Sequence, residues 1–222
     1  MTTKLIAAVV GTLAFILVPL FAWGIGDVRG FIHHPARLAY LAATVLAQIG
    51  ILVFVPDAGL SRKEGDTVVA RQRLAVVLLQ LLSVGVVIVA PYTDARGWAS
   101  LDFPAVRYAG VLLYAAGLFL MNWAIVHLGR HFSVQVTLQK DHELVTHGPY
   151  RFVRHPRYAG ILLCFAGVAL IFASAGALVL VAALLATLAW RVHDEEAMMA
   201  DAFPAEWPRY AQRTARLIPY VY

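Results

Sequence analysis

Residues 158–192 have the sequence YAGILLCFAGVALIFASAGALVLVAALLATLAWRV, in which Arg191 is the only charged side chain. It divides into the apolar segments 158–173 and 176–192, each close to the roughly 17–25 residues with which a helix spans a membrane. Only Ser174-Ala175-Gly176 separate them. Because this connection is so short, we expect a tight helical hairpin that enters the membrane and returns, with two ordinary short spans as the alternative.

Four more apolar runs precede this pair, and they occupy residues 5–24, 38–56, 74–91 and 105–127. The chain of 222 residues is 61% hydrophobic and 14% charged, whereas soluble domains are about 45–50% apolar and about 25% charged. The composition therefore predicts an all-α integral membrane protein with about six membrane segments. We expect residues 5–24 to be a retained helix, because the run is longer than the roughly 7–15 apolar residues of a signal peptide.

Basic residues concentrate in the 57–73 and 128–157 connections and in the tail after residue 192. The positive-inside rule places such regions in the cytoplasm, which predicts that both termini are cytoplasmic. The same rule accounts for the net charge of +5 without a nucleic-acid partner. The 24–37 connection, with Arg29 and Arg37, departs from this pattern, and we expect it to be a short polar loop on the outer side.

Residues 142–158, HELVTHGPYRFVRHPRY, are by contrast strongly polar and include three histidines, three arginines and two tyrosines. Such groups beside membrane segments are costly unless they face a cavity, pair, or lie in water. Gly148-Pro149 and His155-Pro156 interrupt the stretch, so we expect a shaped cytoplasmic loop that binds a cofactor. The chain is then a single structural domain, with a four-helix scaffold in 1–127 and a catalytic region in 128–222 that ends in a C-terminal helix.

A metal site is not expected in this stretch. The histidines 142, 147 and 155 lack the four-residue spacing of helical metal ligands, and the only cysteine, Cys164, lies in an apolar run where a buried thiol is expected. The histidines either hydrogen-bond to the loop backbone or contribute to a ligand site. The sequence also has no glycine-rich dinucleotide fingerprint and no P-loop, so any cofactor binds to the membrane fold itself.

A second polar group follows the last apolar segment, where Arg191 and Glu195 are four residues apart and Glu196 is adjacent. On a continuous helix this spacing pairs the guanidinium with the carboxylate. The pair is either an ordinary surface ion pair or a ligand site in which Arg191 points towards the 142–158 loop and holds an anion. The tail from Phe203 to Tyr222 mixes aromatic and basic residues, which suits either a membrane-interface segment or a lid over a polar site.

Residues 128–222 resemble the isoprenylcysteine carboxyl methyltransferase family, within a broader group that includes the membrane phospholipid N-methyltransferases. The resemblance rests on motifs in the same order and spacing: Leu128-Gly-Arg-His-Phe-Ser133, Gln135, His142-Glu-Leu-Val145, Gly148-Pro-Tyr150, Arg154-His-Pro-Arg-Tyr158, and Arg191 with Glu195-Glu196. Pro204 and Trp207 depart from the family's pattern, and both lie in the tail, where they bear on the acceptor more than on the cofactor.

The resemblance implies an S-adenosylmethionine cofactor bound from the cytoplasmic side, with Arg191 binding the acceptor substrate and Arg191, Glu195 and Glu196 as catalytic residues. The cofactor-binding residues that it implies are Gln135, His142, Glu143, Leu144, Val145, Gly148, Tyr150, Arg154, His155, Pro156, Arg157, Tyr158 and Glu195. Methyl transfer from a sulfonium needs no metal, and the enzyme mainly aligns donor and acceptor, which can be worth roughly 7–11 kcal/mol.

The acceptor is expected to be lipophilic: a prenylated protein, a lipid or a small molecule among membrane lipids. With a carboxylate acceptor, Arg191 would orient the nucleophile through a two-pronged hydrogen bond. With an amine acceptor, Glu196 would remove a proton. Two other functions stay open: an NADPH-dependent sterol-type reductase, favoured by Trp207 and Ile218-Pro-Tyr-Val-Tyr222 but opposed by Arg157, and a non-catalytic membrane protein that keeps the fold.

Overall fold

The computed structural model describes residues 2–54, 70–101, 103–128 and 144–218, in which the regular elements are all helices and two isolated β-bridges occur outside them. The all-α prediction is confirmed. The elements in order are α1 (Thr2–Trp23), η1 (Ile25–Asp27), α2 (Val28–His33), α3 (Pro35–Phe54), α4 (Ala70–Ala95), α5 (Pro104–Leu128), η4 (Gly148–Arg151), α6 (Pro156–Ile171), α7 (Ala175–Ala202) and α8 (Trp207–Arg213).

Each of the six apolar runs forms a helix, and together they make an integral multi-pass membrane protein. Among the described residues, α3, α4, α5 and α7 are long and apolar enough to cross a membrane. The helical segments Val9–Trp23 and Ile25–His33 are bent by 95° relative to one another, and they count as a fifth span if they form one unit. Helix α6 has 16 residues, which gives about 24 Å at the usual rise, less than the roughly 30 Å apolar core of a bilayer. A count of six membrane crossings stays a prediction.

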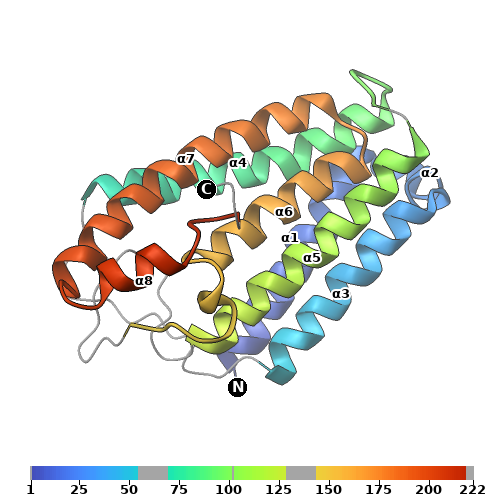
Figure 1. The fold of residues 1–222 in the computed structure, drawn as a ribbon. Helices are drawn as coiled ribbons and strands as arrows, with labels where there is room; N and C mark the ends of the chain where they lie inside the picture. Colours follow the sequence, from blue (N-terminus) through green and yellow to red (C-terminus); the bar gives the residue numbers. More distant parts are fainter. Residues whose placement is uncertain (1, 55–69, 102, 129–143, 219–222) are drawn as a thin grey trace.

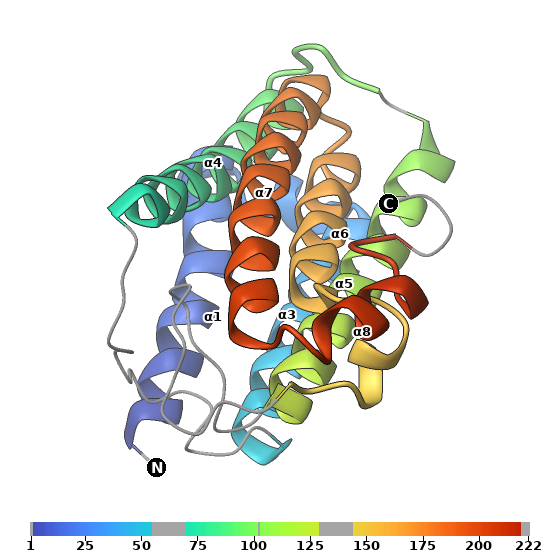
Figure 2. The same ribbon diagram turned by 60° about the vertical axis from the view of Figure 1, so that its left-hand side comes forward.

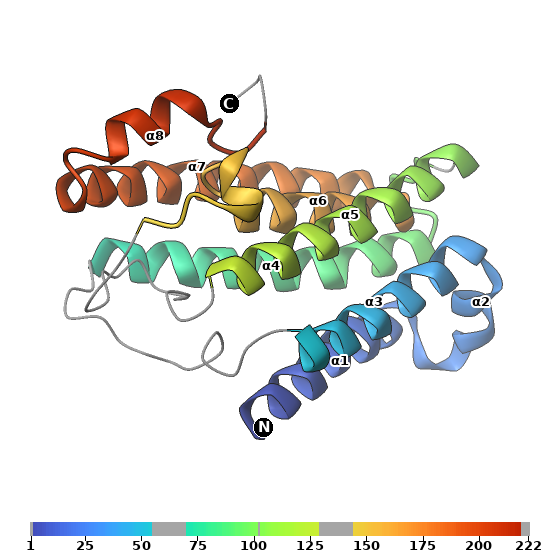
Figure 3. The same ribbon diagram turned by 60° about the horizontal axis from the view of Figure 1, so that its bottom comes forward.

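The helices pack in three layers (Figures 1 and 3). Helices α6 and α7 lie on the side that carries α8, α4 and α5 form the middle, and α1 and α3 form the opposite side. Helix α7 runs beside α4, and α6 runs beside α5. The beginning of α1, the turn η4 and helix α8 all lie at one end of the bundle (Figure 2).

Glycines bring the backbones of α5 and α6 into direct contact. A Cβ added to Gly117 would lie 2.6 Å from the backbone nitrogen of Cys164, and one added to Gly167 would lie 2.5 Å from that of Tyr114. Small residues at such positions are how membrane helices gain van der Waals contact where lipid offers no hydrophobic driving force. This packing fixes the position of α6, whose first turn carries the motif residues. Cys164, as expected, is a buried thiol in this interface.

The prediction of a polar loop at residues 24–37 is wrong. The segment forms η1 and α2, and α3 already begins at Pro35. Asp27 caps α2 by accepting a hydrogen bond of 2.9 Å from the backbone nitrogen of Gly30, and proline at a first helical position starts a helix without losing a hydrogen bond. Asp27 and Pro35 are therefore the start signals of α2 and α3.

The basic residues near this segment are compensated across the bundle. Arg107 at the start of α5 makes two hydrogen bonds of 2.7 and 2.8 Å to Asp94 at the end of α4. Arg37 lies 3.5 Å from the same carboxylate and stacks on the ring of Trp23 at 4.2 Å. These contacts allow both guanidinium groups to lie buried at this end of the bundle.

Candidate functional site

The polar stretch is held in place by the C-terminal tail. After the turn η4, the backbone nitrogens of Arg154 and His155 donate to the carbonyl oxygens of Ala215 and Arg216, at 2.8 and 3.0 Å. Pro156 then opens α6, so the expected loop ends at His155 and Tyr158 is already helical. The first turn of α6 and the residue just before it thus contact Glu195 and Glu196 of α7.

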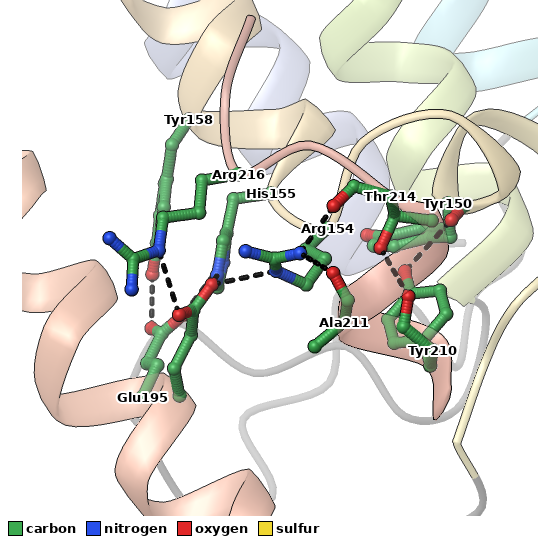
Figure 4. Close-up of polar contacts among 10 residues, drawn as sticks. Tyr150, Arg154, His155, Tyr158, Glu195, Tyr210, Ala211, Thr214 and Arg216 are labelled. Carbon is green, nitrogen blue, oxygen red and sulfur yellow. Dashed lines mark hydrogen bonds and ion pairs between the residues drawn. The ribbon is translucent and has the colours of Figure 1, made fainter. Parts of the chain in front are cut away.

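A compact cluster forms where α6 meets α7 (Figure 4). Tyr158 donates a hydrogen bond to Oε1 of Glu195. Nε of Arg191 lies 2.6 Å from the Tyr158 hydroxyl and 3.1 Å from the same carboxylate oxygen. The predicted pairing of Arg191 with Glu195 is confirmed. The pair is not on the surface, because only 3% of the Arg191 residue is exposed. Arg191 also points towards the motif stretch, as the ligand-site hypothesis expects.

His155 lies between the two carboxylates. Its Nδ1 is 3.4 Å from Glu195 and its Nε2 is 3.4 Å from Glu196, distances of ion pairs more than of well-aligned hydrogen bonds. The imidazole is parallel to the Tyr158 ring, at 5.7 Å between centroids. Burial of the ring lowers the pKa of His155, but the contacts with Glu195 and Glu196 outweigh it and raise this pKa above its usual value.

Glu196 joins the motif stretch to the tail. It accepts hydrogen bonds from Nε of Arg154 at 2.8 Å and from Nε of Arg216 at 2.9 Å. The other end of the Arg154 guanidinium donates to the carbonyl oxygens of Ala211, at 2.7 Å, and Thr214 (Figure 4). Glu196 is thus occupied in holding α8 and the segment after it against the site, and the tail lies over this site as a lid would.

Tyr150 is buried next to α8, and its carbonyl oxygen accepts a hydrogen bond of 2.8 Å from the hydroxyl of Tyr210 (Figure 4). Burial raises the pKa values of both phenols, that of Tyr210 to about 12. Both are therefore neutral at physiological pH, and they can serve as aromatic surfaces or hydrogen-bonding groups but not as bases.

A cavity of about 440 Å³ opens from this cluster into the membrane helices. At one end it is lined by Arg157, Tyr158 and Arg191, and further along by apolar side chains with a few polar ones. Thr44 and Tyr114, joined by a hydrogen bond of 2.8 Å, lie at the far end. An apolar cavity that ends at guanidinium groups suits a lipophilic molecule with an anionic head.

The structure brings together several of the predicted site residues: His155, Tyr158, Arg191, Glu195 and, at the tail side, Arg154 and Glu196. Leu144 and Val145 are half-buried in the segment before η4. Gly148 has a left-handed φ of 61°, and Pro156 starts α6. Gln135, His142 and Glu143 lie outside the described residues. Within the part that the structure describes, no group of three or more metal-ligating side chains is found.

Sequence reasoning missed two parts of this arrangement. Arg216 and the tail carbonyls that hold Arg154 carry no sequence signal, because a carbonyl acceptor is present at every residue. The amides of Gln48, Gln80 and Asn122 line the cavity, and here a signal existed: uncharged polar residues inside membrane helices usually face a partner or a cavity.

Comparison with known proteins supports the motif resemblance. Residues 110–201 match the model of the isoprenylcysteine carboxyl methyltransferase (ICMT) family. The resemblance to this family is confirmed. "Protein-S-isoprenylcysteine O-methyltransferase A" of Arabidopsis thaliana is 28% identical over 151 residues, 67% of this chain and 73% of the relative. The enzyme named protein-S-isoprenylcysteine O-methyltransferase of Tribolium castaneum is 32% identical over 117 residues, 50% of this chain and 41% of the relative.

The match to some of these relatives spans less than two thirds of their length. It covers 62% of the "Probable protein-S-isoprenylcysteine O-methyltransferase" of Oryza sativa subsp. indica, to which the chain is 29% identical over 119 residues. The fold is also that of an ICMT. The structure of the eukaryotic intramembrane Ras methyltransferase ICMT superposes with a TM-score of 0.55 at 18% identity, covering 99% of this chain and 97% of the other.

Proposed function

We propose that this protein is an S-adenosylmethionine-dependent methyltransferase of the membrane, which esterifies the carboxylate of a lipophilic acceptor. The observation that carries the proposal is the cavity: its lining is mostly apolar, and it ends at Arg157, Tyr158 and Arg191, directly beside Glu195. A lipophilic tail fits the one part, and a carboxylate fits the other. The ICMT family resemblance supports the same reaction class.

The residues of the site fit a sulfonium cofactor. A cationic donor needs anions and aromatic faces, and the structure offers Glu195, the stacked rings of His155 and Tyr158, and the buried ring of Tyr150. We infer that the motif residues from Leu144 to Tyr158 and Glu195 bind the cofactor, together with Gln135, His142 and Glu143. S-adenosylmethionine, when bound there, supplies an electrophilic methyl group.

The role of Arg191 is to orient the acceptor. Its guanidinium is held by Tyr158 and Glu195 and lines the cavity, so a carboxylate entering with its tail in the cavity meets a fixed cation. With S-adenosylmethionine bound beside it, Arg191 would hold one carboxylate oxygen in position to accept the methyl group, and the products would be a methyl ester and S-adenosylhomocysteine. A carboxylate carries no proton to remove, so this reaction needs no general base.

The contacts of the Glu196 carboxylate bear on whether the acceptor is a carboxylate or an amine. An amine acceptor would require a base, and Glu196 was the expected one, but it is engaged by Arg154 and Arg216. Carboxyl methylation is favoured for this reason, and we assign to Glu196 the role of holding the tail over the site. Amine methylation remains the alternative acceptor chemistry.

We propose that both termini and the site are cytoplasmic. The basic motif loop and tail support it. Helices α6 and α7 are separated by three residues, which supports the proposal of a tight helical hairpin. Helix α6 is shorter than a membrane span, whereas α7 is long enough to cross. The division into a scaffold, 1–127, and a catalytic region, 128–222, stays part of the proposal.

Calorimetric titration of the detergent-purified protein with S-adenosylhomocysteine, beside NADPH, tests the cofactor. We expect micromolar affinity for the first and no binding of the second. The reverse result would establish the reductase alternative, whose supporting tail residues 219–222 lie outside the described part. Tyr150→Ala and Glu195→Ala should each abolish binding while the protein stays folded, and unchanged affinity in both would exclude this site.

Transfer of a radiolabelled methyl group to an S-prenylated cysteine analogue tests the acceptor. Methyl esters release methanol in mild base, whereas methylamines do not. Base-labile label in the lipid phase supports carboxyl methylation, and base-stable label on an aminolipid would support the amine alternative.

A further inference from the structure

Arg157 lies apart from most of the residues that the family resemblance assigns to the cofactor. Together with Tyr158 it lines the cavity between the membrane helices. None of the other predicted cofactor-binding residues in the described part of the chain lines it, and these include Tyr150, His155 and Glu195. Because the proposed function places the acceptor in this cavity, Arg157 lies on the acceptor's side of the site.

The helical register of α6 accounts for this position. The α6 residues that line the cavity recur at intervals of three or four, as one face of a helix does. They are Arg157, Tyr158, Ile161, Cys164 and Phe165. Since Pro156 starts the helix, Arg157 is the first residue of this face. An acceptor whose tail lies along the apolar part of the face therefore has its head at Arg157.

The same end of the cavity holds a second guanidinium group, that of Arg191. Nε of Arg191 lies within hydrogen-bonding distance of the Tyr158 hydroxyl and of Glu195, and only 3% of the residue is exposed. Arg157 is half-buried instead, so it is the more accessible of the two arginines that line the cavity. An anionic head that reaches Arg191 therefore also meets Arg157.

The two guanidinium groups affect each other. Burial and the positive charge of Arg191 both lower the pKa of Arg157, which precedes the apolar segment 158–173. Like charges that repel one another in an enclosed place are stabilised by an anion that contacts both. A carboxylate suits this place, because its two oxygens accept hydrogen bonds from two donors at once. A protonated amine would instead add a further positive charge.

We propose that Arg157 is a second acceptor-binding residue: with Arg191 it holds the acceptor's carboxylate between two guanidinium groups, and the pair selects the acid over its own methyl ester. The inference rests on the proposed function for the reaction, and it reassigns Arg157 from the cofactor to the acceptor. Methylation turns the carboxylate into a neutral ester, which no longer offsets the repulsion between the two arginines. The product therefore binds more weakly than the substrate, and this difference favours its release.

Binding of an acid and of its methyl ester tests the inference without any methyl transfer. The probes are tritiated N-acetyl-S-farnesylcysteine and its methyl ester, each titrated onto the immobilised, detergent-purified protein in the absence of cofactor. The quantity compared is the ratio of the affinity for the acid to the affinity for the ester. Because the two probes partition differently into detergent micelles, this ratio is compared between variants in the same detergent, where the partition cancels.

Arg157→Gln should lower the acid-to-ester ratio at least about tenfold, the size of one lost hydrogen bond to a charged group. Its affinity for S-adenosylhomocysteine should stay unchanged, which also shows that the variant is folded. Arg157→Lys should lower the ratio less, because lysine keeps the charge but not the two-pronged donor. The matched control is Arg151→Gln, which removes one positive charge from an exposed residue of η4 that does not line the cavity. It should keep the full ratio.

An unchanged ratio in both Arg157 variants would overturn the inference, as would failure of the acid to bind the unmodified protein. A loss of S-adenosylhomocysteine affinity in Arg157→Gln would also overturn it, because Arg157 would then belong to the cofactor. None of these results decides the proposed function, which is tested by the S-adenosylhomocysteine titration of the unmodified protein. Failure of that titration together with an Arg157-dependent ratio would keep the carboxylate site and remove the methyltransferase.

Discussion

Arg154 donates from Nε to Oε1 of Glu196 across 2.8 Å, and the two side chains are only 9% and 13% exposed. Because Arg154 also binds tail carbonyl oxygens and Glu196 also binds Arg216, this one pair joins the motif stretch, α7 and the tail. The position of the tail therefore depends on a charge-assisted contact at the edge of the proposed reaction site.

Glu196→Gln should loosen the tail. A neutral amide keeps the size of the side chain but weakens two charge-assisted hydrogen bonds, so we expect a loss of about 2 kcal/mol in the free energy of unfolding. Trypsin should then cleave faster after Arg213, in α8. The control is Asp201→Asn, at an exposed position on α7, the helix that carries Glu196. It should change neither the stability nor the rate of cleavage. Abolished turnover with unchanged stability and proteolysis would instead support Glu196 as the base for an amine acceptor.

Arg191→Ala should reduce turnover at least about tenfold, the loss expected when an interaction that orients the reacting group is removed. Affinity for S-adenosylhomocysteine should stay near normal, because Tyr158 still donates to Glu195. Tyr158→Phe is the complementary variant: it removes that hydrogen bond and should weaken cofactor binding. Equal turnover of Arg191→Ala and the unmodified protein would show that the arginine has only a structural role.

The raised pKa of His155 makes stability depend on pH. The contacts with Glu195 and Glu196 favour the protonated imidazole in the folded protein, so His155 contributes stability that is fully present below its unfolded pKa of about 6.5. This contribution is lost as the pH rises through the raised folded value. Thermal unfolding measured from mildly acidic to alkaline pH should show a declining midpoint.

His155→Gln should flatten that decline and lower stability mainly on the acidic side. His193→Gln is the control, because His193 is exposed on α7 and has no such contact in the described structure. A pH profile of His155→Gln identical in shape to that of the unmodified protein would assign the dependence to other groups.

The long helices and the Arg191–Glu195 pair could be predicted from the sequence because they depend on local periodicity. Apolar runs with the length of a membrane span have few alternative structures, and a spacing of four places two side chains on one helix face. The family motifs predicted that His155 and Tyr158 belong to the same site as Glu195. The structure brings them together because the start of α6 packs against α7.

What the sequence did not predict depends on long-range packing. Residues 24–37 look polar, yet Arg37 is compensated by Asp94 and Trp23 from other helices, which allows a helix there. The contacts of Glu196 with Arg154 and Arg216 are likewise set by the path of the tail. Neither is encoded within one helical window, so local pattern could not reveal it.

The close contact of α5 with α6 should make Gly117 intolerant of even one methyl group. Its Cβ would lie 2.6 Å from the nitrogen of Cys164 and 2.7 Å from the carbonyl oxygen of Gly160, and these are backbone atoms that cannot turn aside. Gly117→Ala should therefore separate the helices and cost about 1–3 kcal/mol of unfolding free energy, the usual effect of overpacking.

Gly50→Ala is the matched control for Gly117→Ala, since a Cβ there has nothing within 4 Å. In a helix this change should be neutral or stabilise by about 0.5–1 kcal/mol. Thermal unfolding in detergent and S-adenosylhomocysteine titration check the pair together. Because α6 carries Tyr158 to its contact with Glu195, Gly117→Ala should also weaken cofactor binding, whereas Gly50→Ala should not. Equal effects of the two variants would mean that the α5–α6 contact does not position the site.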